Sequence, residues 1–86
     1  MKTKNLNGMY NIVGTNIKKY RELRGLSQRE LSDKLALLGV TLYHSDISRI
    51  ESFDLFVRDY ELKAICKVLS ITFDEVYANT DRNFEF

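Results

Sequence analysis

Residues 25–51 contain two helix starts separated by a break. The first follows Gly25, where Ser27 and Glu30 have the spacing of a capping box. The second follows Gly39 and leads into the segment 43–51, whose polar side chains fall where a second helix would face outward. This pattern is typical of a helix-turn-helix, a unit that can place its second helix in the major groove of DNA.

Apolar residues recur at helical spacing along most of the chain, and there is no proline to interrupt a helix. We expect five helices, at about 12–24, about 27–38, about 44–52, from Asp59 as N-cap to about 69, and after a Thr72–Glu75 capping box. The residues predicted to face inward are Val13, Ile17, Tyr20, Leu31, Leu35, Leu38, Ile47, Ile50, Leu62, Ile65 and Leu69. With no convincing strand, the sequence predicts an all-α domain.

The length of 86 residues suits one domain with a single modest core. We expect a flexible N-terminal leader at residues 1–11, a folded domain at residues 12–78 and a short C-terminal tail at residues 79–86. The formal charge is +5 over residues 1–26 (six basic, one acidic), −1 over 27–51 (three basic, four acidic) and −3 over 52–86 (four basic, seven acidic). Such a gradient can set one face against a polyanion, but a solvated basic first helix would have the same composition.

The sequence argues against several other classes of function. The single cysteine, Cys66, excludes an internal disulfide and a cysteine-based zinc site, and its apolar neighbours indicate a buried thiol. The single histidine, His44, lacks companions for metal binding or nucleophilic catalysis, so we expect no metal, no cofactor and no enzymatic activity. No apolar run reaches transmembrane length and no signal core begins the chain, which favours a cytoplasmic, bacterial or phage-encoded protein without a membrane partner.

Residues 12–78 resemble the phage-repressor/Cro-like helix-turn-helix family of small bacterial and phage transcription regulators, of the xenobiotic-response-element type. The resemblance is carried by Ile17-Lys18-Lys19-Tyr20-Arg21, Gly25-Leu26-Ser27-Gln28, Leu31, Ile47-Ser48-Arg49-Ile50-Glu51 and Leu62…Ile65…Leu69…Glu75-Val76. It implies a five-helix repressor-like bundle whose third helix reads double-stranded DNA, usually as a homodimer on a two-fold site. A repressor that binds a pseudo-palindromic operator is therefore the expected function.

The resemblance also implies roles for individual residues. Arg21 and Glu51 match a family ion pair that ties the first helix to the end of the third, and a charge on the inner side of a helix is tolerated only when it is paired. Two independently solvated charges are the alternative. Gln28 matches a glutamine that contacts a phosphate at the start of the second helix, where backbone N–H groups also point outward. A surface glutamine with good helix propensity is the other interpretation.

The third helix would read bases through its exposed residues. With Tyr43 at the N-cap, the family pattern directs the side chains of His44, Ser45 and Arg49 at base edges. Ser48 lies alongside them. Arg49 is the strongest candidate, because a guanidinium can donate to both O6 and N7 of guanine. Without the flanking motif, these would simply be polar residues on a solvated helix. Lys18, Lys19 and Arg24 are expected near phosphates from charge, not from the motif.

The chain departs from the family pattern in three places. The connection from Leu38 to Ile47 is longer than usual, which leaves the register of the third helix open by one or two residues. Asp54 stands where the family commonly has a phosphate-binding cation. Asp46 lies in the first turn of the third helix, where it favours the helix dipole but repels phosphate; it would accept from cytosine N4 or only cap the helix.

An apolar cluster follows the third helix, at Phe53, Leu55 and Phe56. These residues either plug the core beneath a loop or form a patch for a dimer or protein partner. Together with the acidic second half of the chain, they support an alternative function. The alternative is a protein-interaction module of the same fold, an antirepressor or antitoxin-like partner, with little affinity for DNA.

Overall fold

The computed structural model describes residues 4–84, which form an all-α fold. The helices are α1 (Gly14–Leu23), α2 (Gln28–Leu37), α3 (His44–Glu51), α4 (Asp59–Leu69) and α5 (Phe73–Val76), followed by a short 3-10 helix, η1 (Asp81–Phe84). No strand occurs in this part of the chain, where one isolated bridge pairs Leu6 with Met9. The all-α prediction is confirmed.

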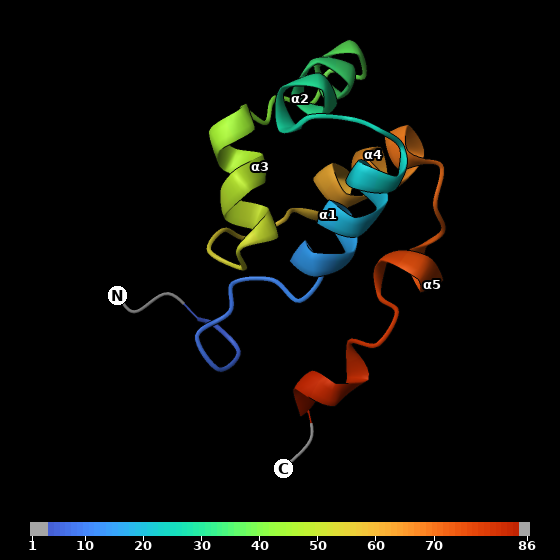
Figure 1. Cartoon of the computed structure of the whole chain (residues 1–86). Coiled ribbons are helices and arrows are strands. Elements are labelled where there is room, and N and C mark those ends of the chain that lie inside the picture. The colour runs from blue at the N-terminus through green and yellow to red at the C-terminus, as the bar shows by residue number, and fades with distance from the viewer. Residues whose placement is uncertain (1–3, 85–86) are drawn as a thin grey trace.

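The helices pack around α1 and α4, with α2 across one end, α3 along one side and α5 below (Figure 1). The side chains that are almost completely buried come from every α-helix: Ile17, Leu31, Leu35, Ile47, Ile50, Ile65, Leu69 and Val76. Burial of this apolar set is the main favourable term in folding. Most of the residues predicted to face inward belong to this set, and Val13 and Leu62 are also buried.

Leu38 was predicted to face inward, but it is 44% exposed. The helix ends at Leu37, and the backbone turns through Gly39 at a φ of 80°. That turn carries Leu38 out of the inward stripe, and the side chains of Val40 and Leu42 are buried instead.

The start of α4 also differs from the sequence prediction. Asp59 is the first helical residue, and Arg58 occupies the N-cap position. The buried carboxylate of Glu61 accepts the backbone N–H of Arg58 at 2.8 Å, which fixes this register. Helix α1, expected at about 12–24, runs from Gly14 to Leu23.

The two terminal segments pack against the helices where the structure describes them. Residues 4–11, expected as a flexible leader, form a turn, and the N–H of Tyr10 donates to the carbonyl oxygen of Phe53 at 2.8 Å. In the tail, Thr80 is buried; just before the tail, the side chain of Asn16 in α1 donates to the carbonyl oxygens of Val76 and Ala78. The outer parts of the predicted leader and tail, residues 1–3 and 85–86, lie outside the described residues. None of the helices in residues 4–84 has the length and apolar character needed to cross a bilayer.

Candidate nucleic-acid interface

A capping box starts α2. The Ser27 hydroxyl accepts the N–H of Glu30 at 3.0 Å, and the Glu30 carboxylate accepts the N–H of Ser27 at 2.9 Å. Hydrogen bonds from the Ser27 backbone, and then from its side chain, lower the pKa of the Glu30 carboxyl. The remaining free N–H groups of the first turn leave this end of α2 suited to an anion such as a phosphate.

The connection between α2 and α3 is long but fixed by burial and hydrogen bonds. Val40 and Leu42 are buried, and the Ser32 hydroxyl donates to the Leu42 carbonyl oxygen at 2.6 Å. At the start of α3, the N–H of Tyr43 donates to the Asp46 carboxylate at 2.9 Å. The sequence leaves two roles open to Asp46, helix capping and acceptance from cytosine N4. This hydrogen bond is the capping role.

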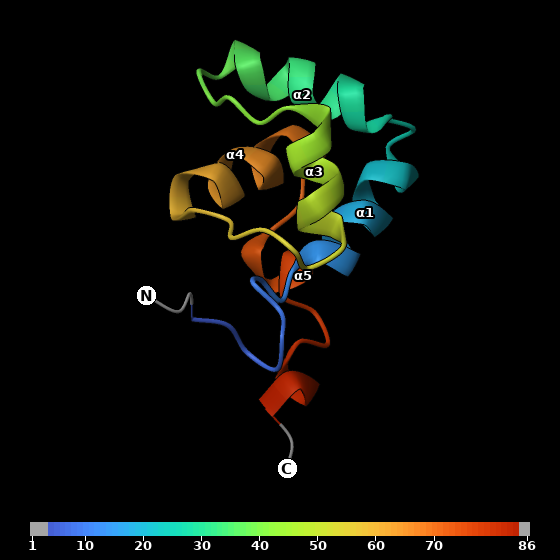
Figure 2. The ribbon, with the colours of Figure 1, turned by 90° about the vertical axis from the view of Figure 1, so that its left-hand side faces the viewer.

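The outer rim of α3 consists of four exposed residues, His44, Ser45, Ser48 and Arg49. Ile47, Ile50 and Glu51 face the interior of the protein. The helix begins directly after Tyr43, so the predicted register is the observed one. In Figure 2, α3 lies at the front of the molecule, and no other element crosses it.

The pair of Arg21 and Glu51 joins α1 to the last residue of α3. Arg21 donates to both carboxylate oxygens of Glu51, at 2.7 and 3.1 Å, and to the carbonyl oxygen of Leu26 at 2.7 Å. Both charged residues are buried, and the hydrogen bond to Glu51 raises the pKa of Arg21. A bidentate contact of this kind compensates the cost of removing two charges from water. The structure thus brings together the two residues that the sequence predicts to pair.

Gln28 lies beside this pair. Its side-chain amide donates to the Glu51 carboxylate at 3.0 Å, and the residue is half-buried. The predicted phosphate contact therefore has to use the second amide hydrogen or the backbone N–H. The amide couples the start of α2 to the end of α3, a role that sequence reasoning missed.

Arg49 points toward the loop that follows α3. Its Nε lies 3.7 Å from the Asp54 carboxylate, and a terminal nitrogen donates to the Asp54 carbonyl oxygen at 3.2 Å. The side chains are 55% and 64% exposed, so both remain accessible from solvent. The acidic residue that departs from the family pattern is thus a direct neighbour of the predicted base-reading arginine.

The three other predicted phosphate contacts occupy different environments on α1 and its end. Lys18 is exposed, and the Lys19 ammonium lies 5.3 Å from the centroid of the Tyr20 ring. Arg24 donates to the carbonyl oxygens of Leu69 and Ser70, at 2.7 and 3.4 Å. The Arg24 guanidinium therefore caps the C-terminal end of α4.

Two residues that the sequence did not single out hold the ends of α1 and α3 together. The Asn11 side chain donates to the carbonyl oxygens of Ile50 and Leu55, at 3.0 and 2.9 Å, and accepts from the N–H groups of Val13 and Gly14. Gly14 packs so closely that an added Cβ would overlap the Ile50 carbonyl oxygen. An asparagine just before a helix is a capping signal that could have identified Asn11. The need for Gly14 arises only from tertiary packing.

The apolar cluster after α3 divides between the two predicted roles. Leu55 packs against the core and Phe53 is half-buried. Phe56 is 46% exposed and contacts the Tyr10 ring edge-on, with 5.1 Å between the ring centroids. Tyr60, Phe73 and Tyr77 are also exposed. The last two line a hollow of about 490 Å³, together with Val57 and Leu62.

Within residues 4–84, no three His, Cys, Asp or Glu side chains gather in a way that could hold a metal ion. Cys66 is a buried free thiol, and burial raises its pKa. No protein-family model, curated protein or solved structure matches the chain.

Proposed function

We propose that this protein is a sequence-specific regulator of transcription that binds double-stranded DNA, acts as a repressor and recognises a pseudo-palindromic operator as a homodimer. The observation that carries the proposal is the outer rim of α3. It offers two hydroxyls, an imidazole and a guanidinium on one exposed face of a helix of 8 residues. These are hydrogen-bonding groups that read base edges in the major groove.

In this proposal, α2 and α3 are the two helices of a helix-turn-helix within a repressor-like bundle. Arg49 donates to guanine, and His44, Ser45 and Ser48 contact neighbouring bases or phosphates. The start of α2, with Gln28, holds one phosphate, and Lys18 and Lys19 supply long-range attraction. Arg24 can contact a phosphate only if its guanidinium leaves the C-terminal end of α4.

The homodimer follows from the size of the interface. One helix covers few base pairs, and a single small module buries little surface on DNA. Two copies related by a two-fold axis would read two half-sites about one helical turn apart. The operator would then be a pseudo-palindrome.

The direct experiment is selection of bound duplexes from a random DNA pool. We expect enrichment of a two-fold motif and a steep decrease in affinity with salt, because basic residues replace counterions on the phosphates. A pool that remains random after repeated rounds would overturn the proposal.

A second candidate function is a protein-interaction module of the same fold. It is favoured by the exposed aromatic residues Phe56, Tyr60, Phe73 and Tyr77 and by Asp54 beside Arg49. If this function is correct, the chain co-purifies with a stable partner and binds duplex DNA no better than a neutral control protein. Substitution of Tyr60 and Tyr77 by serine would then release the partner, whereas Arg49→Ala would not.

A further inference from the structure

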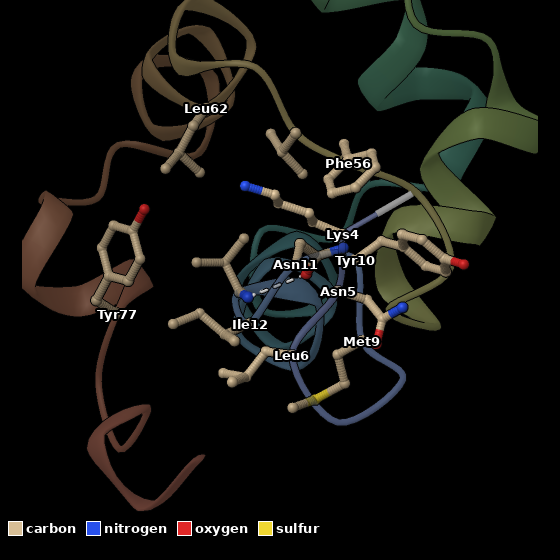
Figure 3. A pocket seen from close by; sticks show the side chains of 12 residues that line it. Lys4, Asn5, Leu6, Met9, Tyr10, Asn11, Ile12, Phe56, Leu62 and Tyr77 are labelled. Carbon is tan, nitrogen blue, oxygen red and sulfur yellow. Dashed lines mark hydrogen bonds between the residues drawn. The ribbon is translucent and has the colours of Figure 1, made fainter. Parts of the chain in front are cut away.

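A cavity of about 350 Å³ lies beneath the N-terminal segment, between it, α4 and α5 (Figure 3). Its wall includes Tyr10 and Asn11, which also hold the loop after α3 and the end of that helix. No sequence pattern indicates this cavity, because it depends on residues 4–11 folding back across the helices.

The lining of the cavity is mainly apolar. Aliphatic and thioether side chains come from the N-terminal segment and α4, and aromatic rings close two sides; the principal contributors are Leu6, Met9, Phe56, Val57, Leu62 and Tyr77. Figure 3 shows Leu62 and Tyr77 on one side and Leu6 and Met9 on another. Clefts of about 300–1,000 Å³ with such a lining are typical of small-molecule sites.

One charged side chain, Lys4, lines this cavity within the described residues. Its ammonium group extends over the cavity toward the side of Leu62 (Figure 3), and no ion pair joins it to another residue of 4–84. The Asn11 amide offers no free hydrogen, because both are donated to Ile50 and Leu55. Among residues 4–84, the charge that lines this cavity is therefore one positive group at the edge of an apolar space.

We propose that this cavity binds a small amphipathic carboxylate, whose apolar body contacts Leu62 and Phe56 and whose acid group pairs with Lys4. The apolar body accounts for the lining, and the acid group complements the Lys4 ammonium. The volume admits a small molecule but not a helix of a partner protein, which would need a long groove. The proposal goes beyond the DNA-binding function and does not depend on it.

Octanoate and 1-octanol are suitable probes, because they share a hydrocarbon chain and differ in charge. Titration of the isotope-labelled protein, followed by amide chemical shifts, should give saturable changes at Leu6, Tyr10, Val57, Leu62 and Tyr77. Octanoate should bind roughly threefold or more tightly than octanol, the range expected for one partly exposed ion pair.

Two variants and one control separate the role of the Lys4 charge from the role of the cavity volume. Lys4→Met removes the charge but keeps most of the unbranched side chain, and it should abolish the preference for octanoate while leaving octanol binding unchanged. Lys34→Met, which removes an exposed lysine on α2 outside the cavity, should behave as the wild type. Leu6→Trp should fill the cavity and abolish binding of both probes, with the helical content of each variant checked by circular dichroism.

Several outcomes would overturn the proposal. They are an absence of saturable shifts, equal affinity for octanoate and octanol in the wild type, and unchanged octanoate affinity in Lys4→Met. Shifts centred on Cys66 and Ile71, which line a separate hollow near the start of α5, would place the ligand there and would also overturn the proposal. Shifts at Leu6 and Tyr10 that grow with protein concentration without a probe would mean that a second copy of the chain covers the cavity, and they would likewise overturn the proposal.

Discussion

Arg49 and Asp54 contact each other where α3 ends, with 3.7 Å between Nε of the arginine and the carboxylate of the aspartate. Both side chains are more than half exposed, so the ion pair contributes little to stability. Arg49 can therefore exchange Asp54 for another partner at a low cost in free energy. The proposed base-reading arginine is therefore held by a contact that it can leave.

The first prediction concerns the competition between Asp54 and DNA. Asp54→Asn removes the carboxylate from Arg49 and one negative charge from the side of α3 that would face phosphates. We expect duplex affinity to rise about threefold at low salt, because Arg49 no longer has to break an ion pair before it contacts DNA. Fluorescence anisotropy with a labelled duplex measures the change.

The matched control for Asp54→Asn is Asp74→Asn, which makes the same charge change at an exposed position on α5. Its affinity for DNA should equal that of the wild type. Weaker binding by Asp54→Asn would mean that Asp54 orients Arg49 productively, which contradicts the competition.

The second prediction concerns the contact between Gly14 and Ile50. Gly14→Ala places a methyl group on the Ile50 carbonyl oxygen, so α1 and α3 must separate. We expect a loss of about 1–3 kcal/mol in the free energy of unfolding, despite the better helix propensity of alanine. Urea denaturation measures this loss.

The control is Thr15→Ala, at an exposed neighbouring position, which should change stability by less than about 0.5 kcal/mol. Equal stability of the two variants would show that the helices are not held this closely.

The third prediction tests the Asn11 side chain. Asn11→Asp keeps an oxygen that accepts from Val13 and Gly14 but places a second oxygen against the carbonyl oxygens of Ile50 and Leu55. The loss of two donated hydrogen bonds should cost about 2–3 kcal/mol of unfolding free energy. Asn7→Asp adds the same charge to an exposed turn of the same segment and should have little effect. A mild effect of Asn11→Asp would mean that residues 4–11 do not support α3.

The Arg21–Glu51 pair was predicted from the family resemblance, and the register of α3 was predicted to within one or two residues. Ile47 and Ile50 have helical spacing, and the capping box at Ser27 fixes where α2 begins. Arg21 falls on the inner side of α1, where an unpaired charge would be costly, which agrees with the partner that the resemblance implies. These features depend on few neighbours and on strong energetic preferences.

Other features depend on contacts between distant residues. Leu38 has the right spacing for burial but lies beyond the end of α2, where the direction of the chain is set by Gly39. Asn11 and Gly14 are defined by their distance to Ile50, which lies far along the sequence. The partnership of Arg49 with Asp54 is also invisible in the sequence, because it depends on how the loop turns after α3. Sequence periodicity carries no information on such approaches.

The fourth prediction concerns the pH dependence of the capping box. The pKa of Glu30 is lowered in the folded protein, so its carboxylate stabilises the fold at pH values above the ordinary glutamate value of about 4.3. This contribution is lost as the pH falls through the lowered pKa. Glu30→Gln keeps an acceptor oxygen but cannot ionise. In urea denaturation, the wild type should be the more stable protein at pH 7, and the difference should vanish in acid. A difference that stays constant with pH would contradict the capping role of the charge.

The central claim is that the outer rim of α3 reads bases, and Arg49→Ala tests it most directly. Affinity should be measured by anisotropy for a selected duplex and for a scrambled duplex, with Arg82→Ala as a charge-matched control on the exposed η1. We predict that Arg49→Ala loses about 1–3 kcal/mol of the preference for the selected duplex, whereas Arg82→Ala keeps it. An Arg49→Ala protein that retains both the affinity and the preference of the wild type would contradict the account.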